Sequence, residues 1–192
     1  MSVGLRERKK AETRQQLMYT AIRLFAEQGF HEVTVSDIAD GANVSPSTFF
    51  RYFDSKAGAV FGLASWRLDL MRERLDERPP HVSVLDVFRD LWHEQIETIE
   101  SDADVFRIQQ DLVERHGPVA AEQAQNFRIV RNLVAAALAD ESPGRLPVET
   151  EMIASAVGNA VFTSLRIWCK QGGNLHETFD AGWRLVERMA SG

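Results

Sequence analysis

The residues that could do acid–base, nucleophilic or metal chemistry are few and widely spaced in this chain of 192 residues. The single cysteine, Cys169, allows neither an intrachain disulfide nor a multi-cysteine zinc site, and we expect it to be an inert core residue. His93-Glu94 lacks the second histidine of a zinc-protease helix, and neither a Glu-x-x-His pair nor a glycine-rich phosphate loop occurs. We therefore expect no enzyme, no catalytic residue, no metal and no cofactor; a helical enzyme is the disfavoured alternative.

The charged residues divide the chain into two parts. The net charge is −6 at pH 7. Residues 1–56 hold 8 Lys/Arg and 7 Asp/Glu, whereas residues 57–192 hold 14 Lys/Arg and 21 Asp/Glu. This asymmetry suggests a small, locally basic head and an acidic body with a different task. Five basic residues form an arm within the first 14 positions: Arg6, Arg8, Lys9, Lys10 and Arg14.

The composition is that of an ordinary globular protein, with 44% hydrophobic and 26% charged residues. We find no apolar run that approaches the ~20 residues of a membrane helix. The first residues also lack the apolar stretch of a secretion signal. Together with the lone cysteine, these features predict a cytoplasmic protein without a membrane partner.

Apolar residues recur with helical spacing almost everywhere, and no alternating strand pattern appears, so we expect an all-α fold. Leu17, Ala21, Leu24 and Phe25 share one face of a first helix, which Gly29 ends. A capping-box pattern from Thr34 to Asp37 opens a second helix. The remaining helices are predicted at residues 57–78, 83–100, 102–116, 119–140, 148–170 and 176–190.

A tight turn, Gly41-Ala42-Asn43-Val44, links the second helix to a short third one. Ser45 caps that third helix, Pro46 fits its first position, and the helix extends to about Phe53. Two short helices behind a longer helix and a basic arm are the parts of a helix-turn-helix unit. In such a unit the second short helix projects into the major groove of DNA, so the start of the third helix should face outward.

At these residues the sequence closely resembles the tetracycline-repressor (TetR) family of transcription regulators, over about residues 10–60. Three positions depart from the family pattern. Phe50 stands where a tyrosine is usual and so lacks a hydroxyl for phosphate, Asn43 replaces the common turn glycine, and Ala57 replaces a frequent acid. The matching residues are Thr13-Arg14, Ala21 to Phe25, Gly29-Phe30, Thr34 to Ala39, Ala42 to Ser45, Thr48 to Phe53, and Lys56.

The resemblance implies that the partner of the head is double-stranded operator DNA. Arg51 is our candidate for a guanine, because its planar fork can pair with O6 and N7. The other base-facing positions are Ser45, Pro46 and Ser47. The positions that match phosphate contacts in the family are Thr34, Thr48, Tyr52 and Lys56. The arm would contact phosphates or an adjacent minor groove through Arg6, Arg8, Lys9, Lys10 and Arg14.

The resemblance further implies two domains: residues 1–56 for DNA binding, and residues 57–192 for ligand binding and dimerisation. Helices 148–170 and 176–190 are rich in apolar residues and could form a four-helix homodimer interface, although a monomer core is the alternative. Polar groups inside apolar stripes suggest a mostly apolar pocket, with ordinary core packing as the alternative. Its candidate lining residues are Phe88, Trp92, Gln95, Phe106, Gln109, Phe127, Arg131, Asn159, Phe162 and Arg166.

The stretch from Ser164 to Gly173 resembles, more loosely, a TetR subgroup associated with acyl-CoA-like ligands. We therefore expect a homodimeric repressor that binds a palindromic operator and is released by a small, mostly apolar effector. The helix predicted at residues 57–78 would be the lever, because it joins head and body. The alternative is a helical adaptor that binds DNA or protein without an inducer.

Overall fold

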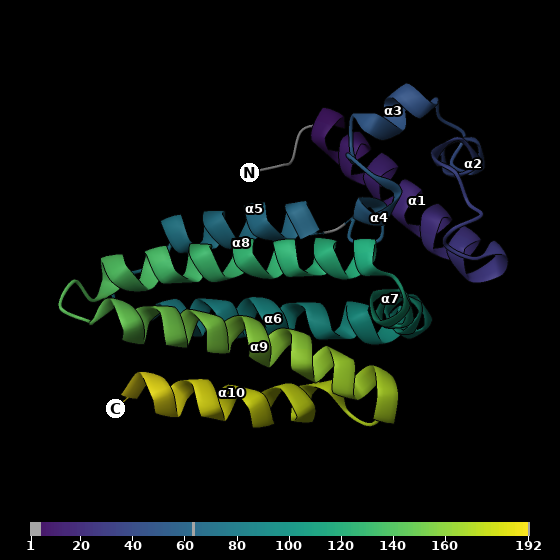
Figure 1. Ribbon diagram of the computed structural model, residues 1–192. Coiled ribbons are helices and arrows are strands. Elements are labelled where there is room, and N and C mark those ends of the chain that lie inside the picture. The colour runs from purple at the N-terminus through teal and green to yellow at the C-terminus, as the bar shows by residue number, and fades with distance from the viewer. Residues whose placement is uncertain (1–4, 63, 192) are drawn as a thin grey trace. The chain divides into compact units, whose positions relative to one another are not determined.

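The computed structural model describes residues 5–62 and 64–191, and it describes side chains over residues 9–62 and 67–191 (Figure 1). Within these ranges the chain forms ten α-helices and no strand, which confirms the all-α fold class. The chain divides into two compact units. The first extends to Arg67 and includes Ile108–Ala124, and the second comprises Leu68–Arg107 and the chain from Gln125 onward. The predicted domain boundary at residue 56, which assigns DNA binding to residues 1–56, stays a prediction.

The first unit begins with helices α1 (Leu5–Gln28), α2 (Val35–Gly41) and α3 (Pro46–Phe50). Leu17, Ile38 and Phe49 are fully buried in its hydrophobic core. Gly29 has a φ of 91° and ends α1 as predicted, because glycine accepts the left-handed conformation. Asn43 has a φ of 55° and makes the predicted turn between α2 and α3.

The prediction of one continuous helix over residues 57–78 is wrong. The structure has a short α4 (Lys56–Ala59), capped by Ser55, and a separate α5 (Ala64–Asp76). Gly62 lies between them, and a Cβ there would stand 2.7 Å from Cβ of Met18 on α1. This close backbone approach fixes the path of the chain at Gly62, and no helical periodicity could reveal it.

The first unit also contains parts of two later helices, α7 (Ala103–Arg115) and α8 (Gly117–Glu141). Leu112 and Val119 are buried in its core cluster. The ring of His116 stacks on Phe30, with 4.7 Å between centroids. The head is thus completed by a segment far away in the sequence.

The second unit contains α6 (Val84–Ser101), α9 (Pro147–Gln171) and α10 (Leu175–Ser191). Helices α9 and α10 lie side by side, joined through Gly172 and Gly173 in left-handed conformations (Figure 1). Contrary to expectation, α9 is long and apolar enough, by length and composition, to cross a membrane. Its residues Val157 and Leu165 are nevertheless buried in the core of the second unit. A helix that is buried in a protein core has the same apolar composition as one that spans a membrane.

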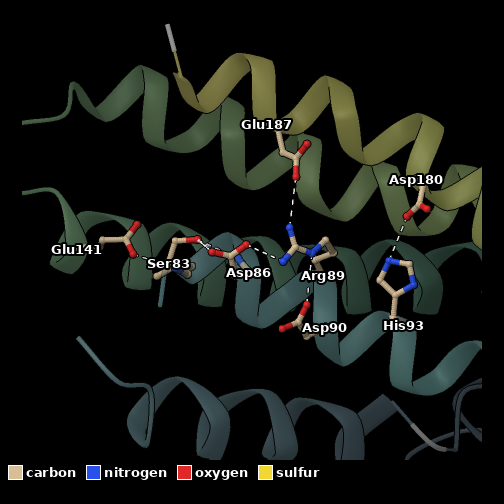
Figure 2. Close-up of polar contacts among 9 residues, drawn as sticks. Ser83, Asp86, Arg89, Asp90, His93, Glu141, Asp180 and Glu187 are labelled. Atoms are coloured by element: carbon tan, nitrogen blue, oxygen red, sulfur yellow. Dashed lines mark hydrogen bonds and ion pairs between the residues drawn. The ribbon is translucent and has the colours of Figure 1, made fainter. Parts of the chain in front are cut away.

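Polar contacts join α6 to α10 (Figure 2). Arg89 pairs with Asp86 at 2.8 Å on its own helix and with Glu187 of α10 at 3.5 Å. Nε2 of His93 lies 3.1 Å from a carboxylate oxygen of Asp180, also on α10. These contacts fix the register of α10 along α6.

Candidate nucleic-acid interface

The start of α3 is held by hydroxyl groups. The Ser45 hydroxyl accepts a hydrogen bond from the backbone N–H of Thr48 at 3.1 Å, the predicted N-cap. Its Oγ also lies 2.8 Å from Oγ of Ser47 and 2.9 Å from Oγ1 of Thr48. These three hydroxyls therefore form one network at the N-terminal end of α3, the helix that was predicted to read bases.

Helix α3 buries one face and exposes the other. Phe49 is 0% exposed, whereas Phe50 is 56% exposed. Pro46, Ser47 and Arg51 are exposed as well. The structure therefore gathers the predicted base-facing residues on one short, solvent-facing segment.

Arg51 and Tyr52 lie together just after α3. The Arg51 guanidinium carbon is 5.9 Å from the centroid of the Tyr52 ring, within reach of a cation–π contact. Tyr52 and Thr48 are half-buried. The aromatic contact steadies the guanidinium while Arg51 stays exposed to solvent.

Thr34 caps the helix before the turn. Its hydroxyl accepts from the backbone N–H of Asp37 at 3.2 Å, and its own N–H donates to the Asp37 carboxylate at 2.7 Å. Hydrogen bonds from the Thr34 side chain and backbone hold the pKa of Asp37 below its usual value. Thr34 is exposed, but its side chain is engaged in fixing the start of α2.

Lys56, which was predicted to contact a phosphate, has hydrogen-bond partners within the chain. Its ammonium donates to the carbonyl oxygens of Phe30, His31 and Val33 at 2.7, 3.2 and 2.8 Å. An ammonium has three hydrogens, and these three acceptors occupy them. Lys56 therefore ties the loop before Thr34 to the start of α4, and its contact with a phosphate stays a prediction.

We expect Lys56→Met to lower the free energy of unfolding by about 1.5–3 kcal/mol, because hydrogen bonds from a charged donor are lost while the aliphatic stem stays. Urea denaturation followed by circular dichroism measures this. Lys9→Met is the control, because Lys9 is exposed on α1. A Lys56→Met protein of unchanged stability that only flattens the salt dependence of DNA binding would support the phosphate role instead.

The residues of the basic arm differ in their surroundings. Arg6 and Arg8 lie outside the described side chains, and Lys9 and Lys10 are exposed on α1. Arg14 instead donates from Nε to the carbonyl of Gly62 at 2.7 Å, and its guanidinium carbon lies 4.9 Å from the centroid of the Phe53 ring. Arg14 therefore anchors the segment after α4, and its contact with a phosphate stays a prediction.

The aromatic residues of the predicted pocket fall into two groups in the second unit. Phe88, Trp92 and Phe106 are buried in one core cluster. Phe127 and Phe162 face each other, with 5.8 Å between ring centroids. A buried feature that sequence reasoning missed accompanies the first group: Nε1 of Trp92 has no hydrogen-bond partner among the described residues.

The polar residues predicted to line the pocket differ in their surroundings. Gln109 belongs to the first unit, where its amide donates to the Val60 carbonyl at 2.7 Å. Asn159 and Arg166 are exposed, Gln95 is half-buried, and Arg131 lies 3.6 Å from the Glu151 carboxylate. The Gln109 hydrogen bond ties α7 to the segment after α4, and a ligand contact of Gln109 stays a prediction.

An open cavity of about 520 Å³ lies where α8 meets α9, at a place that the sequence did not predict. Arg145, Thr150 and Glu151 are among its polar lining residues, and small residues of α8 supply the apolar part. None of the ten residues predicted to line a ligand pocket borders this cavity.

Known proteins share the architecture of the head. Residues 17–60 match the family model described as "Bacterial regulatory proteins, tetR family". The regulator TcmR of Streptomyces glaucescens is 51% identical over 53 residues, which cover 28% of this chain and 24% of TcmR. Residues 17–60 thus resemble the DNA-binding head of TetR-family regulators. A putative mycofactocin biosynthesis regulator, MftR of Mycobacterium tuberculosis, is 34% identical over 82 residues, covering 43% of this chain and 41% of MftR.

The alignments with these two curated relatives thus span between a quarter and two-fifths of their length. Solved TetR-family structures extend the likeness along the chain. A putative TetR-family regulator from Syntrophomonas wolfei has a TM-score of 0.64 at 15% identity and covers 94% of this chain and 96% of its own. FadR from Bacillus subtilis, solved with stearoyl-CoA, also has a TM-score of 0.64 at 15% identity, covering 90% and 96%. At these identities the likeness shows the shared fold.

Proposed function

We propose that this protein is a cytoplasmic repressor of the TetR family that binds a palindromic operator as a homodimer. The observation that carries the proposal is the exposed surface of α3 and the residue after it, which presents Ser47, Phe50 and Arg51. Phe49 is buried on the opposite face of the helix. A recognition helix needs this division, because its outer residues must reach base edges in the major groove. Arg51 would read a guanine, and Lys9 and Lys10 would contact phosphates.

Homodimerisation is supported by apolar side chains on α9 and α10. Val148 and Met152 near the start of α9 are 61% and 55% exposed, and Leu185 and Met189 near the end of α10 are 55% and 42% exposed. The start of α9 and the end of α10 lie at the same end of the helix pair (Figure 1). Large exposed apolar side chains are typical of interaction surfaces, and a two-fold axis here would present α3 twice.

An effector with an acyl chain is the ligand class that we propose for the second unit. The B. subtilis FadR structure holds stearoyl-CoA, and the aromatic residues Phe88 and Trp92 would offer an acyl chain an apolar wall. The Nε1–H of Trp92, which has no partner among the described residues, could donate to a ligand carbonyl, and this would remove the cost of a buried polar group. Release would require the effector to favour a dimer whose two heads are wrongly spaced for the operator. The lever would then be α5, whose residues belong to both units.

A salt series of fluorescence-anisotropy titrations tests the proposal. We expect the protein to bind DNA from upstream of its own gene, or a site selected from random duplexes, at least about 10³-fold more tightly than shuffled DNA. Affinity should fall with salt by about 0.9 log units per contacted phosphate. Equal binding to preferred and shuffled DNA at every salt concentration would refute sequence-specific regulation.

The dimer and the effector are tested with the same protein. Sedimentation at micromolar concentration should give a dimer, and a monomer would refute the proposed interface. Stearoyl-CoA, but not free CoA, should weaken operator binding. If neither compound changes operator affinity, the acyl effector is refuted while the DNA-binding proposal stands.

A further inference from the structure

Phe50 is an apolar ring on a polar surface. It is 56% exposed, and it is the only large hydrophobic residue with high exposure in the described part of the first unit. Phe53, three residues later, is 5% exposed. The chain thus exposes one phenylalanine on α3 while burying its neighbours.

The ring is held outward by its neighbour. Phe49 and Phe50 meet edge to face, with 5.5 Å between centroids and 86° between planes. Phe49 is fully buried, so it gives the outer ring a fixed base. Phe50 lies three residues after Ser47 and directly before Arg51, which places it on the segment proposed to face base edges.

A phenyl ring cannot donate a hydrogen bond to a phosphate and offers no acceptor to a base amino group. The major groove does contain one apolar group, the C5-methyl of thymine, which suits an apolar side chain. Both surfaces are exposed to water before binding, and both leave water when they meet. The methyl group is therefore the base-edge feature that Phe50 fits best.

We propose that Phe50 reads the C5-methyl of a thymine close to the guanine that Arg51 reads, once in each half-site. This inference rests on the proposed function and adds a specificity-determining residue to it. The base preference would come from excluding water between ring and methyl, and it requires no hydrogen bond. The alternative is that the Phe50 ring contacts a deoxyribose, which would give no preference for a base.

Replacement of thymine by deoxyuracil tests the proposal, since it removes the methyl and leaves base pairing intact. Each thymine of the preferred duplex is replaced in turn, and affinity is measured with the full-length protein. At one thymine per half-site we expect about a fourfold loss for the wild type, the effect of burying one methyl-sized group. Phe50→Ala should bind the thymine and uracil duplexes equally, and Phe50→Leu should keep the preference for thymine.

The other outcomes distinguish failure of the methyl contact from failure of the proposed function. Full affinity of the wild type for every uracil duplex, with discrimination against shuffled DNA intact, overturns the methyl contact and leaves the proposed function standing. If Phe50→Ala weakens binding to all sequences alike and the wild type ignores the methyl, the ring contacts sugar instead. Absence of any preferred duplex overturns both proposals. Thermal unfolding of Phe50→Ala verifies that the variant is folded.

Discussion

Replacing Phe49 with alanine is expected to lower the free energy of unfolding by about 3–5 kcal/mol, the usual loss for a buried phenylalanine. Phe49 is 0% exposed, and its ring lies 5.5 Å from that of Phe53. Both rings belong to the core of the first unit together with Leu17 and Ile38. The cavity would remove the support on which α3 rests, so DNA binding should fall with stability. Urea denaturation followed by circular dichroism measures the loss.

Phe50→Ala is the matched control, because it removes the same side chain one position later on the same helix. Phe50 is 56% exposed, so we expect its removal to change the free energy of unfolding by no more than about 0.5 kcal/mol. Equal destabilisation by the two variants would mean that the assignment of buried and outer faces of α3 is wrong.

Arg51→Ala is expected to cost about 1–3 kcal/mol of discrimination at one base pair in each half-site. Arg51 is exposed after α3 and lies against Tyr52, which leaves its planar fork free to meet a base edge. Competition titrations with duplexes changed at each position measure the preference. The loss should be confined to the base pair that Arg51 reads.

Arg23→Ala serves as the control for this effect. Arg23 is also exposed in the first unit, but it pairs with Glu27 on α1 at 3.1 Å. We expect Arg23→Ala to leave the base preferences unchanged. An equal loss of affinity for all sequences in Arg51→Ala would place Arg51 on the phosphate backbone and remove it from base reading.

The sequence was most informative where structure is set locally. The caps at Thr34 and Ser45 follow from side chains that bond to the backbone three residues later. The left-handed Asn43 follows from the tolerance of asparagine for that conformation. The outward position of Ser47 at the start of α3 follows from the predicted helix-turn-helix arrangement. These local rules predicted the fold of the head and its outward face.

The sequence did not reveal contacts between residues far apart in the chain. Lys56 was expected to contact a phosphate from its place in the family pattern, and Arg14 as part of the basic arm. Within the chain their partners are the carbonyls of the 30–33 loop and of Gly62. The break between α4 and α5 depends on Met18, 44 residues before Gly62 in the chain. Gln109 likewise donates to Val60. A side chain's type predicts what it can bond, but the fold decides which partner it meets.

The central claim is that two copies of the exposed α3 surface bind one DNA duplex. Hydroxyl-radical footprinting of the preferred duplex, bound by the full-length protein, tests it most directly. The account predicts two equivalent protected half-sites related by two-fold symmetry, with centres separated by about one helical turn of DNA or a multiple of it. A single protected segment, or uniform protection along the duplex, would contradict it.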